Sequence, residues 1–248
     1  MIEMTETPTA ASAEIARPMF SGVAPCCARP ILFSGPMIRA ILAGEKTQTR
    51  RIVKNRDRLP IGELFDLTPS LGYRASEGSI WAGFISGKSQ FQEYFKCPYG
   101  QPGDSLWVRE AFRIFDRFHE CDHLDACSCP KTGTPIYRAG EKCDDEYKWK
   151  PSIHMPRLAS RITLGITDIR VERLQQISDE DAIAEGIECV GGEYSCCPWR
   201  NYRKGQAGEM NLHCSSPDRS YMTLWESING PGSWKENPWV WVVSFRVV

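Results

Sequence analysis

The sequence predicts a single domain of the α+β class. Several segments alternate apolar and polar residues as strands do, and two or three short amphipathic helices lie between them. No linker or internal repeat divides the chain into two cores. The chain has 248 residues, of which 42% are hydrophobic, and this is enough for one core that carries large insertions. We therefore expect a disordered tail over residues 1–29, which are rich in Ala, Thr, Glu and Pro and lack periodicity, and one domain over residues 30–248.

The first predicted elements are a short strand at residues 31–33 and a helix directly after it. Ser34 suits the N-cap of this helix, and Pro36 suits its first turn because its missing N–H costs little there. Gly44 suits the position just after the last turn. One face of the predicted helix is apolar and holds Met37, Ile38, Ile41 and Leu42.

Three segments lack a regular pattern, and we expect them to be insertions at about 55–101, 116–148 and 188–214. Between the first two, residues 106–112 alternate as a strand. Between the last two, residues 162–171 alternate with a change of phase that indicates a β-bulge.

The rest of the chain predicts two helices and a closing strand. Ser178 starts the first helix, Asp181 stands in the capping-box position, and Gly186 ends the helix. Residues 216–218 start the second helix, whose apolar face holds Tyr221, Leu224, Trp225 and Ile228. One side of the closing strand at 238–248 holds Trp239, Trp241, Val243 and Phe245, and the other holds Val240, Val242 and Ser244.

Composition excludes several classes of protein. The net charge of −1 provides no overall field for a polyanion, so affinity for nucleic acid would need local clusters of positive charge. No apolar run reaches the ~18 residues of a membrane span, and the N-terminus lacks the pattern of a secretion signal. Eleven cysteines are an odd number, which favours reduced thiols over a disulfide framework. We expect a cytoplasmic protein that does not bind membranes.

Positive charge gathers directly after the first helix, within residues 39–58. The basic residues there are Arg39, Lys46, Arg50, Arg51, Lys54, Arg56 and Arg58. Such a cluster can contact phosphates or an electron-rich base. The alternative is a solvated basic loop.

The spacing in this segment resembles the signature of a known family. The pattern Gly44-x-Lys46-x-x-Thr49-x-Arg51 after an amphipathic helix is similar to the motif of ASCH domains, which are relatives of the PUA RNA-binding barrel. Residues 103–110, 149–157 and 174–187 and the closing strand also resemble blocks of this family. The similarity is greatest to the larger ASCH-like proteins of phages and prophages, and it leaves the tail and the insertions uncovered.

The resemblance implies a PUA-like small β-barrel that binds RNA or a modified nucleoside. Some ASCH proteins are amidohydrolases that remove the acetyl group of N4-acetylcytidine with a Lys, Thr and Glu triad, and others are reported as ribonucleases. By motif position the triad corresponds to Lys46, Thr49 and Glu185. A Thr hydroxyl needs an adjacent base, and a lysine can serve if its pKa is lowered. Glu185 could then protonate the departing amine.

The same residues also allow binding without catalysis. Lys46 and Arg51 could hold a phosphate, Thr49 could donate a hydrogen bond to it, and Glu185 could orient an arginine. We place binding ahead of hydrolysis, since a fold does not fix a function. A third alternative is a phage-encoded factor whose insertions bind a host protein.

Other residues are candidates for nucleic-acid contact. The full set is Arg39, Arg50, Arg51, Trp107, Arg109, Lys150, Ser152, His154 and Arg157. Trp107 could stack on a base, although a core role is the more common one for tryptophan. We expect Trp107 and Arg109 to face opposite sides of their strand. His154 could do acid–base work, although a lone histidine is more often structural.

The second insertion is rich in metal-ligand residues, and those that could hold a structural zinc are Cys121, His123, Cys127 and Cys129. Their C-x-H and C-x-C spacings differ from the common C-x₂-C pairs, and the alternative is a loop of free thiols. A looser second set holds Cys189, Cys196, Cys197, His213 and Cys214. A further alternative is one metal shared by the two sets.

Overall fold

The structure is a computed structural model, and its described residues begin at Ala28. The described ranges are 28–54, 70–74, 79–85, 92–121, 127–140, 147–190, 199–203 and 213–248. Most of the predicted tail, residues 1–27, lies outside them.

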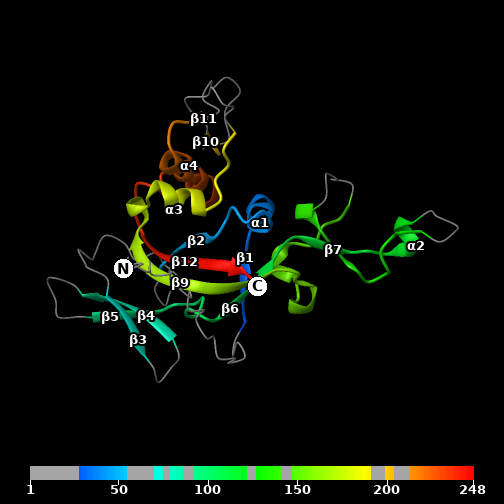
Figure 1. The fold of residues 1–248 in the computed structure, drawn as a ribbon, viewed down its shortest axis with the longest axis horizontal. Helices are drawn as coiled ribbons and strands as arrows, with labels where there is room; N and C mark the ends of the chain where they lie inside the picture. Colours follow the sequence, from blue (N-terminus) through cyan, green and yellow to red (C-terminus); the bar gives the residue numbers. More distant parts are fainter. Residues whose placement is uncertain are drawn as a thin grey trace, which may run out of the picture.

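A five-stranded mixed sheet forms the centre of the fold (Figure 1). Its strands, in spatial order, are β1 (Arg29–Leu32), β6 (Ser105–Arg109), β9 (Thr163–Arg173), β12 (Trp239–Val247) and β2 (Gln48–Ile52). β1 pairs with β6 in parallel, and the other three pairings are antiparallel. The sheet and the helices around it confirm the predicted α+β class.

Four α-helices lie in the described ranges: α1 (Gly35–Leu42), α2 (Arg117–Glu120), α3 (Asp179–Ala184) and α4 (Pro217–Asn229). Four 3-10 segments also occur there, at Arg138–Gly140, Ser152–His154, Arg157–Ala159 and Leu174–Gln176. The prediction of two or three helices missed α2, because a single polar turn carries no apolar periodicity.

The segments predicted as insertions contain most of the remaining strands. β3 (Ser70–Arg74), β4 (Ser79–Ile85) and β5 (Gln92–Lys96) form an antiparallel sheet. β7 (Phe112–Ile114) pairs with β8 (Pro135–Tyr137), and β10 (Trp199–Arg200) pairs with β11 (His213–Cys214). Figure 1 shows β7 and α2 extending to one side of the central sheet.

β12 lies between two hydrophobic cores, where the sequence predicted one, and its side chains alternate between them in the predicted order. Trp239, Trp241, Val243 and Phe245 belong to the larger core, which also contains residues of α1 and β9. Val240 and Val242 belong to the second core, with Tyr221 and Trp225 of α4. Because both faces of β12 are covered, six of its nine residues are buried.

The predicted β-bulge is confirmed in β9. Ser244 of β12 pairs with Asp168, whereas Phe245 pairs with Ile166. Thr167 is the extra residue, and it shifts the register so that Ile166 and Ile169 both reach the larger core.

The pairings in the described ranges leave the central sheet open, since no backbone pairing joins β1 to β2. A side chain spans this gap instead. Arg51 of β2 donates from Nη2 to the carbonyl of Leu32 at the end of β1, over 2.6 Å. Its guanidinium lies 5.3 Å from the centre of the Phe33 ring.

Two residues predicted on buried helix faces are exposed. Leu42 in the last turn of α1 is 51% exposed, and Ile228 near the end of α4 is 57% exposed. The rest of each face follows the prediction, with Ile38 and Ile41 buried in α1 and Tyr221 and Trp225 buried in α4. No helix in the described part of the chain has the length and hydropathy to cross a membrane.

Two glycines that end helices provide a matched test of packing at the α1–α3 junction. Gly44 and Gly186 have φ of +76° and +78°, but a Cβ on Gly44 would meet no atom within 4 Å. A Cβ on Gly186 would lie 2.8 Å from Cβ of Lys46 and 3.1 Å from Cβ of Ala40. We expect Gly44→Ala to cost about 1–2 kcal/mol from its left-handed conformation.

Gly186→Ala should cost about 1–3 kcal/mol more than Gly44→Ala, because it also overpacks the junction. Urea unfolding of the two variants and the parent protein measures both losses. Equal losses would mean that the close contact of Gly186 with Lys46 is not a constraint on the fold.

Candidate functional site

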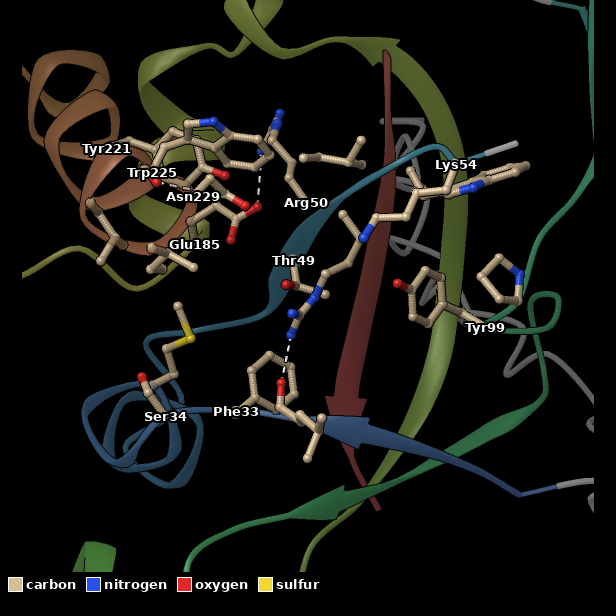
Figure 2. A pocket seen from close by; sticks show the side chains of 18 of the residues that line it. Phe33, Ser34, Thr49, Arg50, Lys54, Tyr99, Glu185, Tyr221, Trp225 and Asn229 are labelled. Atoms are coloured by element: carbon tan, nitrogen blue, oxygen red, sulfur yellow. Dashed lines mark hydrogen bonds and ion pairs between the residues drawn. The ribbon is translucent and has the colours of Figure 1, made fainter. Parts of the chain in front are cut away.

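A cavity of about 720 Å³ opens beside β2. Its walls come from β2, the start of α1, the end of α3, one face of α4 and the chain after β5. Figure 2 shows Thr49 in the middle of the wall, with Glu185, Tyr221 and Trp225 on one side and Lys54 and Tyr99 on the other. The volume falls within the roughly 300–1,000 Å³ of small-molecule sites.

The chain after α1 positions the key side chains through a tight connection. Gly44 adopts φ +76°, and the N–H groups of Glu45 and Lys46 then both donate to the carbonyl of Ala40. The N–H of Thr47 donates to the carbonyl of Ala184 over 2.9 Å, which ties this connection to the end of α3. β2 therefore starts beside Glu185, the C-cap residue of α3.

Lys46 is fully buried and bound at every donor position. Its Nζ donates to the Gln48 carbonyl at 2.8 Å, to the Glu185 carbonyl at 2.7 Å and to Oε2 of Glu185 at 2.8 Å. Burial lowers the pKa of Lys46, although the adjacent Glu185 carboxylate acts in the opposite direction. An ammonium has three donors, and here all three are used.

The structure brings two of the three predicted triad residues to the cavity wall. Thr49 and Glu185 both line the cavity, whereas Lys46 lies behind Glu185 and does not. Within the described residues the hydroxyl of Thr49 makes no hydrogen bond. It can therefore turn toward a bound molecule.

Arg50 is the centre of a buried ion network. Its guanidinium contacts Glu172 at 2.5 Å, Asp181 at 2.8 Å and Glu185 at 3.3 Å. Burial alone would lower the pKa of Arg50, but the carboxylates of Glu185 and Glu172 outweigh it and raise the pKa. Sequence reasoning assigned Arg50 to nucleic acid, but its guanidinium is occupied by carboxylates of its own chain.

The network also fixes α3 against the sheet. Burial alone would raise the pKa of Asp181, but hydrogen bonds and charge from Arg50 and Arg170 lower it. Arg170 of β9 also contacts Glu172 at 3.1 Å and Asp181 at 2.5 Å. The Glu185 carboxylate thus lies at the end of an ordered array of charges.

Two tyrosines that the sequence analysis did not select also line the cavity. Burial raises the pKa of Tyr221 well above its usual value and also raises that of Tyr99. Both phenols are therefore neutral at physiological pH and can donate hydrogen bonds. The helical pattern placed Tyr221 in the core, whereas Tyr99 lies in a segment with no pattern at all.

Exposed cations border the cavity. Lys54 after the end of β2 and Lys96 at the end of β5 both line it and are exposed. Arg51 lines it as well, although part of its guanidinium is bound to the Leu32 carbonyl. Lys96 was not predicted, because no pattern in the sequence indicates that β5 ends close to β2.

The other predicted nucleic-acid residues divide into two groups. Ser152 lines the cavity. The residues that do not line it are Arg39, Trp107, Arg109, Lys150, His154 and Arg157. Arg56 and Arg58 of the basic segment lie outside the described residues.

Trp107 is buried beneath cationic side chains. It is 7% exposed, and the guanidinium groups of Arg109 and Arg157 lie 4.7 Å and 5.9 Å from its ring. The prediction that Trp107 and Arg109 face opposite ways is wrong, because residues two apart on a strand share one face. The burial of Trp107 favours its core role over base stacking.

Three of the predicted metal residues lie in the segment around α2, which Figure 1 shows apart from α3 and α4 at the cavity wall. Cys121, Cys127 and Cys129 have their Sγ atoms within 4.8 Å of one another, and His123 lies outside the described residues. Of the second set, Cys196 and Cys197 also lie outside. Figure 1 places β11, which carries Cys214, in a different part of the molecule from α2, so Cys214 and Cys121 do not share a metal.

Comparisons with protein-family models, curated proteins and solved structures find no match for this chain.

The contact between Lys46 and Glu185 can be tested with a double-mutant cycle. Glu185→Gln should cost about 3–5 kcal/mol, because it leaves a buried ammonium without its carboxylate. Lys46→Met should cost less, since Glu185 retains Arg50 as a partner. In the Lys46→Met background, Glu185→Gln should then cost less than it does in the parent protein. Chemical denaturation of the four proteins measures this coupling, and purely additive losses would contradict the ion pair.

Proposed function

We propose that this protein binds a nucleobase of RNA, or a modified nucleoside, in the cavity beside β2. The carboxylate of Glu185 carries the proposal, because it lines the cavity and is held by Lys46 behind it and by Arg50, which also lines the cavity. An ionised carboxylate has about four acceptor directions, and these two cations use one on each oxygen. Each oxygen can still accept a hydrogen bond from an N–H group on the edge of a base.

The surroundings of Glu185 suit a nucleoside. Thr49 and the neutral phenols of Tyr99 and Tyr221 can donate hydrogen bonds to carbonyl or ring-nitrogen acceptors. Trp225 also lines the cavity and adds apolar surface. Lys54 and Lys96 at the border can contact phosphates, as binding of an RNA strand requires.

A PUA-like architecture accords with this proposal. The open sheet has β1 and β2 at its two edges, and the Arg51 side chain joins these edges where a closed barrel would use backbone pairing. The resemblance of residues 44–51 to the ASCH motif supports the same assignment. Under this proposal the motif spacing keeps Lys46 under Glu185 and Thr49 on the cavity wall.

Hydrolysis of an N-acylated base is the second candidate, and the lowered pKa of Lys46 favours it. In such a reaction neutral Lys46 would take the proton of Thr49 as its oxygen adds to the acyl carbon. The C–N bond would then break, and the amine would leave with the proton that Lys46 had first passed to Glu185. Water would finally hydrolyse the ester on Thr49 and release the acid. We rank this second because all three donors of Lys46 are bound to acceptors, so it would have to lose a proton and turn.

Binding can be measured by quenching of tryptophan fluorescence, because Trp225 and Trp241 line the cavity. We expect Thr49→Val to weaken binding of nucleosides by about five- to tenfold through loss of one hydrogen bond. Lys54→Ala should leave nucleoside binding unchanged. It should reduce the salt dependence of binding to single-stranded RNA by about 0.7 in slope, the value for one phosphate contact.

Arg39→Ala is the matched control, since Arg39 is exposed on α1 and does not line the cavity. It should change neither measurement. If Arg39→Ala weakens binding while Thr49→Val does not, the binding site is not this cavity.

Hydrolysis has a separate test with N4-acetylcytidine as the substrate. If the chain is an amidohydrolase, Thr49→Ala should abolish release of acetate, while binding of the nucleoside falls only about tenfold or less. Chromatography of the reaction products measures turnover. If the parent protein binds N4-acetylcytidine but does not hydrolyse it, this result would support the binding function and contradict the hydrolytic one.

A further inference from the structure

Three cysteine side chains converge at the α2 end of the molecule, well away from the cavity. Cys121 follows α2 directly, and Cys127 and Cys129 come from the return arm of the same segment. Their Sγ atoms all lie within 4.8 Å of one another, and those of Cys121 and Cys127 are 3.4 Å apart. None of the three side chains is fully buried.

The surrounding segment has almost no core of its own. We call residues 113–121 and 127–138 the thiol lobe. Phe115 is the only buried residue in this lobe, and Phe118 is 87% exposed. A segment with so little apolar burial gains little from the hydrophobic effect, so its ordered conformation needs another source of stability.

Backbone contacts already bring the two arms of the thiol lobe together beside the sulfurs. The N–H of Gly133 donates to the carbonyl of Phe115 over 2.9 Å, and the N–H of Arg117 donates to Oγ1 of Thr132 over 3.2 Å. The Asp116 carboxylate accepts from the N–H of Phe118 and starts α2. These contacts hold the chain so that Cys121 faces the return arm.

We propose that Cys121, Cys127 and Cys129 bind one Zn²⁺ ion that stabilises the thiol lobe. Zinc–thiolate bonds of about 2.3 Å in a tetrahedron place the sulfurs about 3.8 Å apart, so shifts of under about 1 Å would complete the geometry. A disulfide would join two of the three sulfurs and leave the third unused. Soft thiolates at this density favour zinc over the harder divalent cations. The fourth position of the tetrahedron remains for another donor.

The test uses the full chain, purified under reducing conditions from cells supplied with zinc. Elemental analysis should give one zinc per chain. Cys127→Ser should lose this metal, and Cys189→Ser is the matched control, because Cys189 is an exposed thiol that is not part of the cluster. Retention of zinc by Cys127→Ser, or its equal loss from Cys189→Ser, would overturn the proposal.

Two further measurements do not depend on the folding of a variant. Replacement of zinc by Co²⁺ should produce the visible absorption bands of a tetrahedral site and the near-ultraviolet bands of thiolate ligands. Removal of zinc with a chelator should speed tryptic cleavage at Arg117, Lys131 and Arg138 in the thiol lobe, without a matching change at the central sheet. A parent protein with no stoichiometric metal, or with a disulfide between Cys121 and Cys127 under reducing conditions, would overturn the proposal.

Discussion

The contact of Lys46 with Glu185 is the interaction on which the rest of the site depends. It joins the segment after α1 to the end of α3, two places far apart in the sequence, and both side chains are buried. A buried ammonium is costly without a partner, and Lys46 has three acceptors within 2.8 Å. The position of Glu185 at the cavity wall follows from this requirement. Gly186 permits it, because a side chain there would press against Lys46.

The ion network also separates two roles that positive charge could play. Arg50 is surrounded by Glu172, Asp181 and Glu185, so its charge is used to order the site. Lys54 and Lys96 are exposed at the border, and Lys54 can contact a phosphate there without first breaking a buried ion pair. A count of basic residues in the sequence cannot distinguish these roles. Burial and partners decide them, which explains why the basic segment does not act as a single patch.

Patterns among residues close together in the sequence predicted the helices and strands well. Contacts between residues far apart in the sequence could not be predicted from such patterns. Alternation in β12, the bulge after Ile166 and the cap at Ser178 depend on neighbouring residues, and all three occur in the structure. The proximity of residues 46 and 185 came only from a family resemblance, since periodicity cannot bring two distant segments together. Tyr99 and Lys96 reach the cavity from an aperiodic segment, and no local signal could have identified them.

The cavity and the three cysteines of the thiol lobe lie in different parts of the molecule. The proposed binding function and the stability of the thiol lobe therefore depend on different contacts. The residues that line the cavity belong mainly to the central sheet, α1, α3 and α4, where two cores and buried ion pairs fix their positions. The thiol lobe has one buried aromatic residue and must depend on other contacts. A metal bound there would order its own segment and leave the carboxylate of Glu185 unchanged, because the Lys46 and Arg50 contacts hold that group from within the central domain. The proposed binding site and the proposed metal site therefore rest on separate physical causes.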